Sequence, residues 1–104
     1  MDRLAIWSTM EAKPGREADV HAWLTEANRR IAEGEPGTTT STVMDLGAGQ
    51  FAIFNTFADK AALKAHVDGP VADWVKATAR DLLAAPFSIT KADVFGVKPH
   101  QVPA

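Results

Sequence analysis

Two polar side chains near the middle of the chain could do chemistry, and both lie in the sequence FNTFADKAALKAHVDGP of residues 54–70. His66 can change its charge near neutral pH, so it could take a proton from an acidic phenol. It could equally cap the C-terminus of a helix or bond to a strand carbonyl. Asn55 could donate a hydrogen bond to a substrate oxygen or an oxyanion, or it could be a satisfied core amide. We take His66 and Asn55 as the candidate catalytic residues.

Large apolar side chains surround these two positions. If residues 50–57 form a strand, alternation places three of them on the face that carries Asn55, namely Phe51, Ile53 and Phe57. An apolar wall around a single amide is typical of a pocket lining, so we predict that these three residues bind substrate. Trp23 and Trp74 could stack on a planar substrate and join this set, although their helical spacing also suits core packing.

The chain lacks the residues and the spacing of the common metal and nucleotide sites. It contains no cysteine, which excludes disulfides, a thiolate nucleophile and thiolate metal ligands. The three histidines have no HExxH spacing, and Asp19 diverges from His21 on a helix, so we expect no tight metal site. The sequence GAGQFA of residues 47–52 fits the dinucleotide fingerprint in its Gly/Ala form, but it opens a strand and not a helix. We therefore expect no bound cofactor.

Length and charge indicate one domain without a strongly charged partner. The 104 residues have room for one core, so we treat 1–104 as a single domain, with its core over 3–97 and a loose tail over 98–104. The formal net charge is −2 and both signs are mixed, which argues against nucleic acid or a membrane surface as a partner. No segment has the apolar length of a membrane span, and the N-terminus does not resemble a signal peptide. The expected location is the cytoplasm.

The hydrophobic pattern predicts four strands with helices between them. Strands are expected over residues 4–11, 38–46, 50–57 and 87–97, and helices over 16–33, over 59–66, and from Pro70 to a point before Pro86. The short turn Gly47-Ala48-Gly49 makes a hairpin of the second and third strands. Asp59 is a suitable N-cap for the short helix that ends near His66. Pro70 suits the first turn of the next helix.

The element order β-α-β-β-α-β is that of a split βαβ unit. It predicts an α+β, ferredoxin-like fold, in which a four-stranded antiparallel sheet carries its helices on one face. Both faces of the strand over 50–57 are mostly apolar, whereas a sheet with one wet face should alternate with polar residues. Because the helices cover only one face, we expect a second copy of the sheet to cover the other in a homodimer.

Several of these signals occur together in a known family. The chain has Lys13-Pro14-Gly15 before the first helix, Glu35-Pro36-Gly37 before the second strand, and DKAALKAH over residues 59–66. In this combination, over roughly residues 3 to 97, it resembles the antibiotic biosynthesis monooxygenase family. The resemblance implies a ferredoxin-like subunit and a dimeric α+β barrel, with a pocket beside Asn55 and His66. Characterised members include oxygenases of quinols and polyphenols that use no metal or flavin, and relatives that bind and degrade haem.

We therefore predict a cofactor-independent monooxygenase that acts on a small phenolic or quinol-type molecule. In this mechanism His66 helps to deprotonate the hydroxyl, and Asn55 holds the resulting oxyanion. The resemblance also places Phe57 where the family often has a tryptophan, and the chain has no tyrosine. These differences favour an alternative function, in which a non-catalytic dimeric barrel binds a small hydrophobic ligand or haem.

Overall fold

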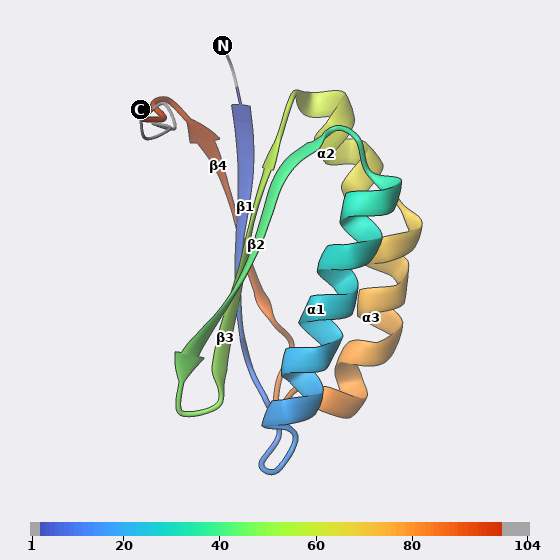
Figure 1. Ribbon diagram of the computed structural model, residues 1–104, viewed down its shortest axis with the longest axis vertical. Coiled ribbons are helices and arrows are strands. Elements are labelled where there is room, and N and C mark those ends of the chain that lie inside the picture. The colour runs from blue at the N-terminus through green and yellow to red at the C-terminus, as the bar shows by residue number, and fades with distance from the viewer. Residues whose placement is uncertain (1–2, 99–104) are drawn as a thin grey trace, which may run out of the picture.

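The computed structural model describes residues 3–98, which form an antiparallel sheet with three helices on one of its faces (Figure 1). The strands are β1 (Arg3–Glu11), β2 (Thr38–Gly47), β3 (Gln50–Phe57) and β4 (Ser88–Val94), and the helices are α1 (Glu17–Gly34), α2 (Lys60–Val67) and α3 (Pro70–Leu82). The strand order is β2-β3-β1-β4, and all neighbouring pairs are antiparallel. The predicted α+β, ferredoxin-like fold is confirmed.

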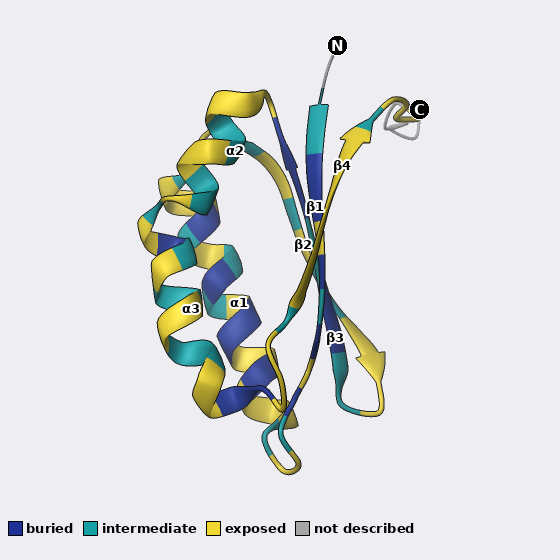
Figure 2. Cartoon of the chain, turned by 180° about the vertical axis from the view of Figure 1, so that it is seen from behind, coloured by how far each residue is buried: buried dark blue, intermediate teal, exposed yellow. Residues whose placement is uncertain are grey.

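Helix α1 buries the apolar face that its 3.6-residue period predicts (Figure 2). Its buried side chains are Val20, Trp23, Leu24, Ala27 and Ile31. Val20, Trp23 and Leu24 meet Met10 of β1 and Phe51 of β3 in the main hydrophobic cluster, where each large side chain contributes roughly 1.5–3 kcal/mol by burial. No helix of the described chain is both long and apolar enough to cross a membrane.

Two local signals fix where α2 and α3 begin. The side chain of Asp59 accepts a hydrogen bond from the backbone N–H of Ala62 at 2.8 Å, as a helix N-cap does. Pro70 lies in the first turn of α3, where its missing N–H is not needed. Because α2 ends at Val67, His66 lies in the last turn of this short helix. The residue that follows, Asp68, caps the helix end through its backbone N–H.

Strand β4 is shorter than the predicted 87–97. It pairs with β1 from Thr9↔Ser88 to Arg3↔Val94. Residues 95–97 extend past Arg3, where the described part of β1 begins, so they have no strand beside them there. Their apolar residues suit a strand, but a strand also needs a partner for its backbone. Of the tail expected over 98–104, all but Lys98 lies outside the described residues.

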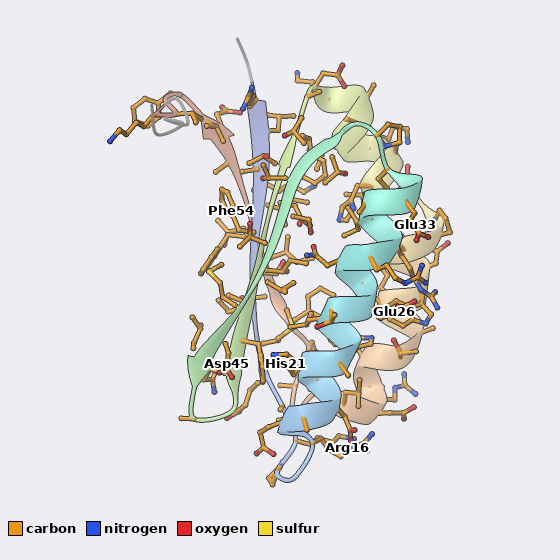
Figure 3. All side chains as sticks on the ribbon, viewed as in Figure 1. Arg16, His21, Glu26, Glu33, Asp45 and Phe54 are labelled. Carbon is orange, nitrogen blue, oxygen red and sulfur yellow. The ribbon has the colours of Figure 1, made fainter. Side chains whose placement is uncertain are left out.

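Within residues 3–98, no helix covers the face of the sheet opposite to α1, α2 and α3, and this face has no charged residue between the ends of its strands. We call it the open face; alternation and register assign to it Ala5, Trp7, Thr9, Thr40, Thr42, Met44, Ala52, Phe54, Thr56, Ser88, Thr90 and Ala92. Trp7 is 38% exposed there, and its ring centroid lies 6.3 Å from that of Phe54. Figure 3 shows Phe54 pointing away from the helices. One chain therefore leaves a broad apolar and hydroxyl-bearing surface uncovered.

Candidate functional site

A cavity of about 210 Å³ lies between the sheet and the helices. Residues of β1, β3 and β4 form one wall, and residues of α1, α2 and α3 form the other. The lining is mostly apolar, and its polar and charged side chains are Ser8, Asn55, His66, Lys76 and Lys91. The fold thus brings the two predicted catalytic residues, Asn55 and His66, to the same apolar space.

His66 is tied to a carboxylate from a distant part of the chain. Its Nδ1 lies 2.7 Å from Oε1 of Glu35, in the turn between α1 and β2. The same oxygen accepts a hydrogen bond from the hydroxyl of Thr38 at 2.8 Å. The exposed fractions of the His66 and Glu35 side chains are only 14% and 10%, and the ring of Phe57 packs against the imidazole at 5.1 Å between centroids. The imidazole is therefore held on two sides.

This contact selects the tautomer of the imidazole ring. A carboxylate can only accept, so Nδ1 carries the proton and donates it to Glu35. In the neutral ring Nε2 is then the basic nitrogen, and it has no hydrogen-bond partner among residues 3–98. Because His66 lines the cavity, this arrangement can take a proton from a molecule bound there, and Glu35 stabilises the charge that the ring acquires.

Asn55 brings an unsatisfied amide to the cavity. Only 3% of the residue is exposed, and its Oδ1 has no hydrogen-bond partner among the described residues. Its cross-strand neighbours are Ile6 on β1 and Ser41 on β2, and the Ser41 hydroxyl also lacks a partner. A buried polar group without a partner costs about 1–3 kcal/mol, so an amide oxygen kept in this state is suited to accept a hydrogen bond from a ligand hydroxyl.

The predicted substrate-binding residues occupy different places. Ile53 and Trp23 line the cavity beside Asn55 and His66. Phe51 and Phe57 are 3% and 0% exposed and pack into the core on the same strand face, outside the lining. Trp74 is outside the lining too; its ring lies 6.4 Å from that of Trp23, under the guanidinium of Arg30 at 4.0 Å. Alternation gives the face of a strand, but the overlying helices decide which part of that face stays open.

Four residues of the site are additional to those that the sequence indicated. Glu35 was visible only as part of a turn, and its contact with His66 spans 31 positions of the chain. Ser8, Lys76 and Lys91 line the cavity from β1, α3 and β4. A lone acid directly before a Pro-Gly turn is the one signal that could have identified Glu35.

Ion pairs on the outer helix surfaces shift the pKa values of exposed groups. Hydrogen bonds from Arg29 and Arg30 lower the pKa of Glu26 to about 2, and the bond to Glu26 raises the pKa of Arg29. Lys64 pairs with Asp68 at 2.7 Å, which raises the pKa of Lys64 and lowers that of Asp68. Figure 3 shows Glu26 on the side of α1 that faces away from the sheet. Within residues 3–98, no three histidine or acidic side chains gather as a metal site requires.

Comparison with known proteins assigns this chain to a family. The sequence profile of the antibiotic biosynthesis monooxygenase family matches residues 4–77. The solved structure of NE2512, a protein of unknown function from Nitrosomonas europaea, is 36% identical over 97% of each chain, with a TM-score of 0.87. A candidate antibiotic biosynthesis monooxygenase from Caulobacter crescentus CB15 is 17% identical over 90% of this chain and 91% of that one, with a TM-score of 0.80. No curated protein sequence matches the chain.

The similarity to the Caulobacter protein shows the fold alone, since its identity is low. The profile match is more specific, because it covers more than half of the chain and includes β1, the turn with Glu35, and α2 with His66. NE2512 extends the similarity over nearly the whole chain. The chain belongs to the antibiotic biosynthesis monooxygenase family.

Proposed function

We propose that this protein is a cofactor-independent monooxygenase that acts on a small phenolic or quinol-type substrate. The observation that carries the proposal is the buried His66–Glu35 pair, which presents a basic nitrogen to an apolar cavity. The unsatisfied amide of Asn55 lines the same space. A base and a hydrogen-bonding group in a dry pocket are what the deprotonation of a phenol requires.

In the proposed mechanism the substrate supplies all the electrons. Nε2 of His66 takes the hydroxyl proton, and the side-chain –NH₂ group of Asn55 donates a hydrogen bond to the phenolate oxygen. The electron-rich ring then reacts with dioxygen. For a phenol oxidised to a para-quinone, one oxygen atom replaces the ring hydrogen and the other leaves as water. The four electrons that this reduction needs come from the phenol, so no external reductant is consumed.

The cavity wall supports this chemistry by keeping water away from the anion. Ile53 and Trp23 present apolar surface on opposite sides, from β3 and α1. In such surroundings the hydrogen bond from an amide to a phenolate is stronger than in water. A planar ring also has large faces that Trp23 can contact.

We also propose that the working form is a homodimer in which the open faces of two sheets meet. The open face is uncharged between its strand ends and holds Trp7 and Phe54 close together. Surfaces of this kind on small proteins commonly mark interfaces. The cavity lies on the other side of the sheet, so each subunit keeps its own site.

One observation favours a second function, in which the protein binds a small hydrophobic molecule without oxidising it. Phe57, which stands at the position where the family often has a tryptophan, is fully buried and does not line the cavity. That strand position therefore offers the ligand no aromatic surface and no indole N–H. A cavity with one base and one amide could hold a phenol and leave it unchanged.

Oxygen uptake separates the two functions. The purified protein is tested against a panel of naphthols and quinols in an oxygen electrode, with a chelator present and no flavin or metal added. The monooxygenase proposal predicts uptake above autoxidation and one ¹⁸O atom from ¹⁸O₂ in the product. Ligands that raise the melting temperature but cause no uptake at any concentration would support the binding protein and contradict the monooxygenase.

A further inference from the structure

Two lysines line the solvent side of the cavity, opposite its polar inner end. Lys76 lies on α3 and Lys91 on β4, and both are exposed. Asn55 is buried and His66 is mostly buried, so they form the inner end. Apolar side chains separate the two ends, among them Ile6 and Val75.

The positive charge of the two lysines is not compensated by a close carboxylate. Among residues 3–98, no acidic side chain lies within 4.0 Å of either ammonium group. Asp68 is near Lys76, but it already pairs with Lys64 at 2.7 Å. The other acids on the same elements, Asp73 and Asp81 on α3 and Asp93 on β4, make no ion pair in this part of the chain either. A ligand at the solvent side of the cavity therefore meets two lysine ammonium groups that have no close carboxylate among the described residues.

The strand register gives the distance between the two ends. Asn55 is the cross-strand partner of Ile6, and Ile6 is the partner of Lys91, so the three lie in one row across β3, β1 and β4. Two steps between neighbouring strands, each of about 4.8 Å, separate Asn55 from Lys91 by roughly 10 Å at the backbone. A flexible lysine side chain can shorten that span.

The size of the cavity limits the number of rings that it can hold. At about 210 Å³ it is smaller than the roughly 300–1,000 Å³ of pockets that take drug-sized ligands. One ring or two fused rings fit such a volume. The row from Asn55 to Lys91 is long enough for such a ring system to carry one polar group at each end.

We propose that the ligand of this site is a small mono- or bicyclic aromatic acid with a phenolic hydroxyl at one end and a carboxylate at the other. The hydroxyl meets His66 and Asn55, the ring lies along the apolar wall, and the carboxylate pairs with Lys76 and Lys91. The inner half of this assignment rests on the proposed function. The outer half rests on the two lysines and does not require that any reaction occurs.

The test compares 6-hydroxy-2-naphthoate with 2-naphthol, which has the same rings and hydroxyl but no carboxylate. Isothermal titration calorimetry on the wild-type protein is expected to show tighter binding of the acid, by about tenfold at low salt, with the advantage shrinking as salt is added. Lys76→Met and Lys91→Met should each weaken the acid about threefold and leave 2-naphthol unchanged. Lys98→Met makes the same charge change at an exposed position outside the cavity lining and should alter neither ligand.

Equal binding of the two compounds to the wild type would overturn the proposal, as would an acid preference that survives in the Lys76→Met/Lys91→Met double variant. Failure of both compounds to bind would contradict the size and ring class assigned to the ligand. Lysine-dependent binding of the acid without any oxygen uptake would uphold this inference and sink the monooxygenase. Oxygen uptake with neutral naphthols alone would uphold the monooxygenase and contradict this inference.

Discussion

Nδ1 of His66 lies 2.7 Å from Oε1 of Glu35, although 31 positions of the chain separate the two residues. The contact joins the end of α2 to the turn that leads from α1 into β2. It fixes the ring orientation and leaves Nε2 as the basic nitrogen of a histidine that lines an apolar cavity. The proposed activity depends on this pair, and Glu35 acts in it by positioning His66.

Replacing Glu35 with glutamine should lower kcat by about 100-fold or more with little change in KM. The amide nitrogen of glutamine can donate to Nδ1, which favours the tautomer with its proton on Nε2 and removes the base from the cavity. Steady-state oxygen uptake measures both constants. Glu33→Gln, an exposed control in the last turn of α1, should retain wild-type values. A Glu35→Gln variant with wild-type kcat would show that the pair is structural only.

Asn55→Leu should weaken ligand binding and turnover without lowering the free energy of unfolding. Leucine is similar in volume and removes a buried amide oxygen that has no partner in the described chain, so the free energy of unfolding should stay level or rise by about 1 kcal/mol. Ligand binding and turnover should fall, because the hydrogen bond to the substrate oxygen is lost. Urea unfolding and calorimetry give the two readouts.

Ser41→Ala is the matched control for Asn55→Leu, since its hydroxyl is also unpartnered but lies outside the cavity lining. It should leave binding unchanged. If Asn55→Leu lost about 1–3 kcal/mol of stability, the amide would be a satisfied core group and its assigned role would be wrong.

Phe54→Lys should convert the proposed dimer into monomers. It places a charge at the centre of the open face, beside Trp7, where a face-to-face dimer would have to bury it. Light scattering coupled to gel filtration at micromolar concentration gives the mass, and circular dichroism checks the fold. Ala77→Lys, on the exposed side of α3, should stay dimeric. A wild-type monomer under these conditions would refute the dimer outright.

Gly37→Ala should destabilise the fold and loosen α2. A Cβ at position 37 would lie 2.6 Å from the Cβ of Ala62, so α2 must shift and carry His66 with it. We expect a loss of about 1–3 kcal/mol in the free energy of unfolding and a lower kcat. Ala62→Gly in the same chain removes the clash and should recover much of both, beyond the cost of about 1 kcal/mol that a helical glycine carries. Additive losses in the double variant would rule out this contact as the cause.

Much of the fold could be predicted because its signals are local. The Asp59 cap, Pro70 in the first turn of α3 and the glycines of the β2–β3 turn each fix an element boundary within a few residues. The end of β4 could not be placed this way, since it depends on where its partner β1 begins. Strand pairing is a property of two segments, and apolar composition alone extended the strand too far.

The site could be predicted only in part for the same reason. Alternation correctly placed Asn55 on the strand face of Phe51 and Phe57, and the helix ending near His66 was located from sequence. The overlying helices, however, decide that Phe51 and Phe57 are buried while the cavity opens beside Asn55. The link from Glu35 to His66 exists only once the chain has folded.

The most direct test of the account is the protein-dependent rate of dioxygen uptake by His66→Ala, compared with the wild type on the same phenolic substrate without added cofactor. Circular dichroism and thermal unfolding first establish that the variant is folded. The proposed role of His66 as the base predicts a rate at least about 100-fold lower, with ligand binding largely retained. A rate within about twofold of the wild type would contradict it, because a base that can be removed without loss does not take the proton.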